Sequence, residues 1–198
     1  DRGTILPNLA ESWDVSDDTL TYTFKLKSGA TFQDGSPVEA KDVVYSVNRL
    51  LTINEGPAYL FEGVLGPDSV KAINSSTVEF KLSKVYTPFL TNTPILFVIN
   101  SDVANANKTD SDPWAQDFIA NNSIGAGAYK LDSWDRGATM TMKAYEGYHL
   151  GWSDQPVLEV RFIVTNEEAT VKALAASGEL SMSSDAQAQE TYDSIGKM

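Results

Sequence analysis

The order of strand-like and helix-like segments in this 198-residue sequence predicts a mixed α/β fold of the α+β kind. Residues 21–27 alternate strictly between apolar and polar side chains, which is typical of a strand with one buried face. The apolar spacing changes to a helical period over 40–51. Three further alternating segments cluster in 125–164, so strands and helices do not alternate regularly as in a doubly wound parallel sheet.

The first helix is predicted from apolar residues that fall on one helical face, namely Ala40, Val43, Val44, Val47, Leu50 and Leu51. Ser36 and Glu39 have capping-box spacing, and Pro37 would then occupy the first helical position. A start nearer Glu39 is the alternative, because boundaries drawn from sequence shift by about two to four residues. The turn before the helix contains Asp34 and lacks the lysine and the extra glycines of a phosphate-binding loop.

The other predicted elements follow from the same periodicities and from turn and cap residues. In chain order they are a hairpin over 70–82, a short helix or turn and then a strand over 88–97, two short helices after Ser101 and after Pro113, three strands over 125–164, a helix over 166–178 and a short strand over 179–183. The last helix has Asn166 as its predicted cap, two glutamates in its first turn and Gly178 beyond its end.

The composition excludes several classes of function. The formal net charge is −12, and nucleic-acid binding needs clustered Lys and Arg, so no nucleic-acid partner is expected. The chain has no cysteine, which excludes a disulfide scaffold, a zinc–thiolate site and a cysteine nucleophile. The longest apolar run, 94–99, is too short to span a bilayer. Because residue 1 is not Met, we expect a processed chain or a piece of a longer one.

No residue pattern predicts catalysis, a metal site or a cofactor. The single histidine, His149, has neither the partners of a zinc site nor a G-x-S-x-G serine, and is interpreted as a surface or strand-end residue. The 27 acidic residues leave a carboxylate pair open, so a glycoside hydrolase stays as an alternative. Aromatic residues outside the periodic segments, such as Tyr59 and Phe61, suit a binding cleft or the edge of a core.

Several short patterns occur in a fixed order near the start of the chain. They are P-x-L-A-x-S-W, T-F-x-L, F-x-D-G-x-P and A-x-D-V, carried by Pro7, Leu9, Ala10, Ser12, Trp13, Thr23, Phe24, Leu26, Phe32, Asp34, Gly35, Pro37, Ala40, Asp42 and Val43. Together they closely resemble the signature region of family 5 of the extracellular solute-binding proteins, which are receptors of ABC importers. Residues 76–90, 125–134 and 178–183 resemble later motifs of the family, while Ala128, His149 and Ser181 depart from them.

The resemblance implies a periplasmic binding protein-like II fold with two lobes that close around a ligand. Residues 1–198 would form most of lobe I, without its opening strand and without the second lobe. The implied function is the substrate-binding component of an ABC importer, which captures a solute, an oligopeptide or dipeptide above all, and delivers it to the membrane permease. The implied protein is a monomer, not an enzyme, and is periplasmic or extracellular, with lipoprotein anchoring as one option.

The resemblance also implies where the ligand binds. Relatives place an aromatic residue in the cleft after the first helix, which matches Tyr59, with Phe61 nearby, and the stretch from Thr93 to Phe97 lies near the cleft. With half of the site expected elsewhere, this chain alone is expected to bind ligand weakly or not at all. The alternatives are a carboxylate-dependent glycoside hydrolase, a carbohydrate-binding module and a structural or adhesive module.

Overall fold

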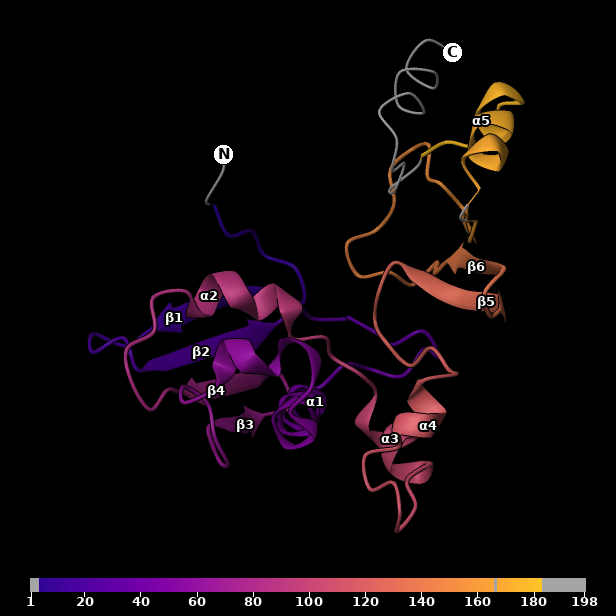
Figure 1. The fold of residues 1–198 in the computed structure, drawn as a ribbon. Coiled ribbons are helices and arrows are strands. Elements are labelled where there is room, and N and C mark those ends of the chain that lie inside the picture. The colour runs from indigo at the N-terminus through magenta and orange to yellow at the C-terminus, as the bar shows by residue number, and fades with distance from the viewer. Residues whose placement is uncertain (1–3, 166, 183–198) are drawn as a thin grey trace. The chain divides into compact units, whose positions relative to one another are not determined.

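The computed structural model describes residues 4–165 and 167–182, which fall into two compact units (Figure 1). The first unit contains the residues up to 130 together with 143–158. The second contains 131–142 together with the residues from 159 onward. Mixed strands and helices confirm the predicted fold class. Within the described residues no helix is long and apolar enough to cross a membrane.

The first unit is built on a four-stranded antiparallel sheet with the order β1-β2-β4-β3. Its strands are β1 (Ala10–Val15), β2 (Thr21–Leu26), β3 (Val70–Asn74) and β4 (Thr77–Lys81). The predicted strand and hairpin are therefore confirmed. Strand β1 was not predicted, because AESWDV does not alternate cleanly and a register shift between Ala10 and Ser12 interrupts it. Its pairing with β2 makes it a strand.

Helix α1 (Ala40–Ile53) lies against β3 and β4 (Figure 1). It begins at the alternative boundary, with Glu39 as its cap, and the Glu39 N–H donates to Asp42 Oδ2 at 2.8 Å. The predicted start at Ser36 is wrong because that side chain belongs to the preceding turn, where its hydroxyl donates to Asp34 Oδ1. The helix ends at Asn54, which adopts the left-handed conformation.

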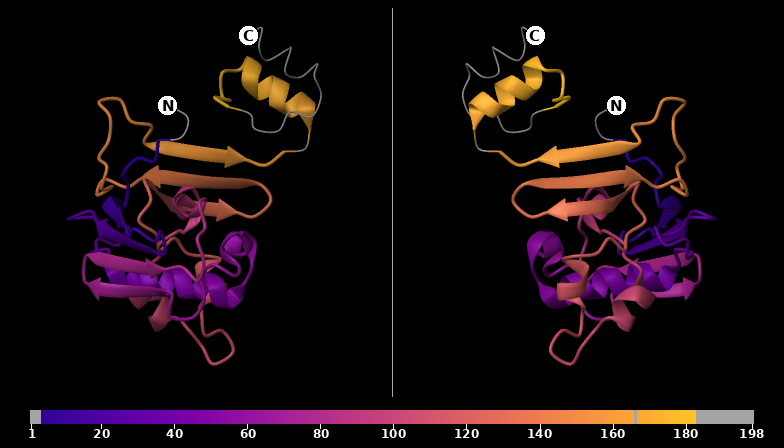
Figure 2. Two further views of the ribbon diagram at one scale, coloured as in Figure 1. Left: turned by 90° about the vertical axis from the view of Figure 1, so that its left-hand side faces the viewer. Right: turned by 90° about the vertical axis from the view of Figure 1, so that its right-hand side faces the viewer.

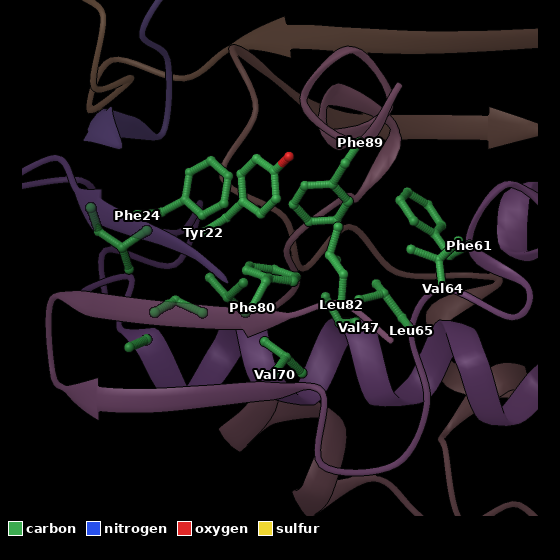
Figure 3. Close-up of a cluster of buried hydrophobic side chains, with 14 residues drawn as sticks. Tyr22, Phe24, Val47, Phe61, Val64, Leu65, Val70, Phe80, Leu82 and Phe89 are labelled. Atoms are coloured by element: carbon green, nitrogen blue, oxygen red, sulfur yellow. The ribbon is translucent and has the colours of Figure 1, made fainter. Parts of the chain in front are cut away.

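An aromatic cluster fills the core between the sheet and the elements that cover it (Figure 3). Phe89 lies at its centre, with ring centroids 4.6 Å from Tyr22, 5.5 Å from Phe80 and 6.4 Å from Phe61. Strict alternation in β2 and β4 turns their apolar side chains toward this cluster, and α1 contributes Val47. The sequence thus positions one apolar sheet face against one apolar helix face.

Short helices connect the sheet to the rest of the chain. They are η1 (Gly56–Phe61), α2 (Phe89–Asn92), η2 (Thr93–Ile95), α3 (Ser101–Ala106) and α4 (Gln116–Ile119). The predicted helix after residue 88 and the two predicted helices after Ser101 and Pro113 are confirmed. The strand predicted before residue 99 is replaced by a single bridge between Ile99 and Gly125.

A second, three-stranded sheet has the order β5-β6-β7 (Figure 2). Its strands, β5 (Tyr129–Asp135), β6 (Thr139–Ala144) and β7 (Glu159–Ile163), confirm the three predicted ones. Helix α5 (Glu168–Ala176) confirms the last predicted helix, although its predicted cap, Asn166, lies outside the described residues. Residues 179–182 form no strand, contrary to prediction, and Ser183 is not among the described residues.

Candidate ligand-binding cavity

A cavity of about 530 Å³ opens in the first unit beside the apolar face of the four-stranded sheet. The sheet contributes Trp13 from β1, Phe24 and Leu26 from β2, and Val78 and Phe80 from β4. The register brings these side chains together, because Phe24 is paired with Trp13 on one side and with Val78 on the other. We call this set of five residues the cavity floor. The volume of the whole cavity is typical of a small-molecule site.

The segment 93–99 forms one wall of the cavity. Two contacts tie its end in place: the Ile99 N–H donates to Ser46 Oγ on α1 at 3.0 Å, and Ile99 bridges to Gly125. Within the wall, the Thr93 hydroxyl donates to the Leu90 carbonyl at 2.8 Å. Phe97 is 78% exposed, so the wall presents apolar surface that a ligand can cover.

A polar pair lies at the edge of the cavity, where residues far apart in sequence meet. His149 Nε2 and Asn8 Oδ1 are 2.9 Å apart, and the imidazole packs against the ring of Tyr148 with centroids at 4.7 Å. Since an amide oxygen only accepts, Nε2 carries the proton and Nδ1 is the acceptor nitrogen. Desolvation lowers the pKa of His149 below its usual range, and the positive charge of Lys27 lowers it further. The imidazole is therefore neutral at pH 7.

The titration of His149 tests this environment directly. It is the sole histidine of the chain, so its Hε1 resonance can be followed by NMR without assignment ambiguity. We expect its midpoint to lie below about 6.5, the ordinary value for histidine. Lys27→Gln removes the nearby positive charge and should move the midpoint upward. A midpoint at or above 6.5 in the unmodified chain would contradict the desolvated placement of His149.

The structure brings together two of the four residues predicted from the resemblance. Thr93 and Phe97 both line the cavity. Tyr59 lies in η1 with 70% of its surface exposed and is not among the lining residues. Phe61 has no exposed surface and packs edge-on against Phe89, so it belongs to the core and presents nothing to a ligand. The alternation of exposed and buried residues within the short helix η1 separates these two aromatics.

Sequence reasoning missed Trp13, Asn8 and His149 as lining residues. His149 is partly buried rather than a surface residue, and its contact with Asn8 spans 141 positions. One signal was present: the sole histidine occupies a position where the family motif has an aromatic residue, within the aromatic-rich sequence EGYHLGW. The sequence thus shows that His149 is unusual, but it does not show that Asn8 is its partner.

The described lining of the cavity holds one imidazole, that of His149, and lacks the carboxylates of a glycosidase. It contains no Asp or Glu, so the carboxylate pair that a glycosidase needs is not found in it. In the part of the chain that the structure describes, no group of three or more His, Asp or Glu side chains is placed to hold a metal ion. What the lining provides is shape and apolar surface, which suit recognition rather than bond cleavage.

Comparison with known proteins identifies the family. The model of bacterial extracellular solute-binding proteins, family 5 middle, matches residues 4–197. The probable D,D-dipeptide-binding periplasmic protein DdpA of Escherichia coli is 38% identical over 137 residues, which cover 68% of this chain and 25% of the relative. The dipeptide-binding protein of the same species is 28% identical over 186 residues, 85% of this chain and 34% of the relative. The chain thus spans about a quarter to a third of these relatives.

Solved structures agree with the sequence comparison. The substrate-binding protein CtaP of an ABC transporter from Listeria monocytogenes superposes with a TM-score of 0.79 at 29% identity, over 96% of this chain and 38% of that one. NikZ from Campylobacter jejuni, solved in complex with Ni(L-His), superposes with a TM-score of 0.74 at 26% identity, over 88% of this chain and 34% of that one. The chain belongs to family 5 of the bacterial extracellular solute-binding proteins.

Proposed function

We propose that this chain forms part of the substrate-binding component of an ABC importer that captures a dipeptide or oligopeptide and delivers it to the membrane permease. The observation that carries the proposal is the cavity, which is lined by Thr93 and Phe97 in a chain of this family. Relatives support the peptide assignment, since two of them are named as binding dipeptides or D,D-dipeptides and a third, from Shigella flexneri, as binding glutathione.

In this proposal the solute is captured because binding removes apolar surface from water, and no covalent bond forms or breaks. A solute that covers the exposed ring of Phe97 removes apolar surface from water, at about 25 cal/mol for each Å² of apolar area. Burying the polar backbone of a peptide costs free energy unless each of its N–H and C=O groups finds a partner. Specific binding therefore needs polar groups on more than one side of the ligand, and the apolar floor of the cavity supplies only one side.

The described residues correspond in this proposal to the first lobe of a two-lobed receptor that acts as a monomer. The ligand would be enclosed when a second lobe closes over the wall at 93–99 and over the exposed ring of Tyr59. The receptor would work outside the cytoplasmic membrane, free or held by a lipid anchor, where it meets both solute and permease. One lobe covers only part of a ligand, so this chain alone should bind peptides with a Kd on the order of 1 mM or weaker.

An NMR titration of the chain with the tripeptide Ala-Phe-Ala tests the proposal, because NMR detects millimolar binding. Phe97→Ala should weaken binding about fivefold to tenfold, since truncation removes an exposed aromatic contact at the cavity. Ile73→Ala is the matched control: Ile73 is 56% exposed on β3 and does not line the cavity, so binding should not change. Peptide binding that Phe97→Ala leaves unchanged, or that Ile73→Ala weakens as much, would contradict the proposed binding site, and micromolar binding would contradict the expectation that this chain holds only part of the site.

A further inference from the structure

We infer that the cavity is a subsite for an uncharged, apolar group of the solute, an aromatic ring or a branched aliphatic side chain, and that it rejects groups carrying a charge of either sign. The assignment rests on the proposed function and deepens it, because it names the class of peptide side chain that the site selects. It follows from three properties of the cavity: the absence of charge in its lining, its aromatic floor and its size.

The lining carries no formal charge. Among the residues that the structure describes, no Lys, Arg, Asp or Glu lines the cavity. A charged group placed there would lose its hydration without gaining an opposite charge. A carboxylate, an ammonium group or a bare metal ion is therefore excluded, and the discrimination comes from the lining and not from the net charge of the chain.

Two of the polar groups in the lining are already hydrogen-bonded within the chain. His149 Nε2 is hydrogen-bonded to Asn8 Oδ1, and the Thr93 hydroxyl donates to the Leu90 carbonyl in the preceding helix α2. Desolvation holds the pKa of His149 low, so the imidazole adds no positive charge at neutral pH. The polar backbone of a bound peptide can lie beside these groups, while the floor favours apolar atoms.

The aromatic floor favours a ring. The Phe24 ring lies 6.5 Å from Trp13 in a tilted arrangement and 5.5 Å from Phe80 edge-to-face. Aromatic groups prefer these same offset and edge-on geometries over face-to-face stacking, which adds to the gain from area burial. An additional ring in the cavity would continue this pattern with Trp13 and Phe24 as neighbours.

The size of the cavity sets the size of the group. The apolar space of about 530 Å³ is partly open to solvent, so a ligand can enter it. An apolar cavity of about 150 Å³ suffices to bind benzene. The volume here therefore accommodates a bicyclic ring with room for the adjoining backbone. Phe97 and Leu6, which are 78% and 74% exposed, border this space and leave further apolar surface for the ligand to cover.

Three probes with the same ring system test the assignment on the complete 198-residue chain: indole, indole-3-carboxylate and tryptamine. By NMR titration, indole should bind saturably, and both charged probes should bind at least tenfold more weakly. Tryptamine is the decisive comparison, because a net charge of −12 attracts a cation and general electrostatics alone would favour it. Tryptamine binding as tightly as indole, or no saturable binding of indole, would overturn the assignment.

A matched pair of variants locates the effect. Phe97→Asp places a carboxylate on the cavity wall and should reduce or reverse the preference for indole over tryptamine. Val85→Asp adds the same charge at another exposed apolar residue, 62% exposed and outside the lining, and should leave the preference unchanged. Both side chains are exposed, so thermal unfolding followed by circular dichroism should show an intact fold. An equal effect of the two variants would contradict a site at the cavity.

Peptides separate this assignment from the proposed function. We expect Ala-Phe-Ala to bind more tightly than Ala-Lys-Ala and Ala-Glu-Ala. If all three peptides bind equally well and indole does not bind, the chain captures peptides but the apolar subsite is wrong. If indole binds at the cavity and peptides bind elsewhere, without displacing indole and without a response to Phe97→Ala, the apolar subsite holds and the proposed function of the cavity is wrong.

Discussion

Replacing Asp42 by alanine should lower the free energy of unfolding by about 3 kcal/mol, because it leaves three buried or half-buried donors without their acceptor. The side chain is 1% exposed. Its Oδ1 accepts from the backbone N–H and the hydroxyl of Ser101 at 3.0 and 2.6 Å, and its Oδ2 accepts from the Glu39 N–H at 2.8 Å. Asp42 thus joins the start of α1 to the start of α3.

Denaturant unfolding followed by tryptophan fluorescence measures this loss. Asp17→Ala is the matched control, since Asp17 is exposed in a turn and its replacement should cost less than about 1 kcal/mol. Asp42→Asn keeps the shape but places a donor group near other donors, so it should recover little of the lost stability. If Asp42→Ala unfolds within 1 kcal/mol of the unmodified chain, the hydrogen-bond network does not anchor α1 as described.

The same network should affect binding. Ser46 Oγ donates to the Asp42 carbonyl at 2.6 Å and accepts from the Ile99 N–H, so α1 holds the end of the cavity wall. The Asp42 carboxylate holds Ser101, two residues further along. Asp42→Ala removes the carboxylate contact to Ser101 and keeps the backbone carbonyl that Ser46 uses, so it loosens one of the two attachments near the end of the wall. Asp42→Ala should therefore weaken indole binding even under conditions where the variant stays folded.

Replacing Phe89 by alanine should destabilise the first unit by about 3–5 kcal/mol, which is typical of removing a buried aromatic ring. Phe89 has no exposed surface and packs against Tyr22, Phe61 and Phe80 (Figure 3). The loss combines the transfer of the ring to water with the cavity that it leaves behind, because the surrounding rings are fixed by the sheet and cannot collapse fully.

Two further variants calibrate this effect by the same denaturant measurement. Phe89→Leu keeps most of the apolar volume and should cost clearly less than the alanine variant. Phe162→Ala removes the same ring from a site on β7 that is 45% exposed and should cost less than about 1 kcal/mol. Similar losses for Phe89→Ala and Phe162→Ala would show that the aromatic cluster is not the core of the first unit.

The predictable parts of the fold are those whose periodicity reflects one-sided burial. Strand β2 and helix α1 each bury one face, so their apolar spacing could be read directly from the sequence. Strand β1 could not be predicted, because its pairing with β2 stabilises it and its own residues do not alternate. The start of the helix depends on which local hydrogen bonds form. The Ser36 hydroxyl donates to Asp34 in the preceding turn, and the Asp42 side chain accepts from the Glu39 N–H, so the helix begins after Glu39 and not after Ser36.

The candidate site was predictable only in part. The resemblance led to Thr93 and Phe97, but the floor of the cavity depends on strand register, and the pair formed by Asn8 and His149 depends on tertiary contact. Phe61 was predicted near the cleft, but its side chain is fully buried in the core. An aromatic residue outside the periodic segments can turn inward as readily as outward. Local sequence therefore indicates which residues are unusual, and the fold decides which of them share a surface.

The most direct test of the cavity as the binding site is the Ala-Phe-Ala titration read atom by atom. Intermolecular nuclear Overhauser effects should connect the phenyl ring of the peptide to the side chains of Trp13 and Phe97, which line the cavity from its floor and its wall. Chemical shifts of exposed residues outside the cavity, such as Ile73, should not change. Saturable binding in which the phenyl ring contacts neither Trp13 nor Phe97 would contradict the account.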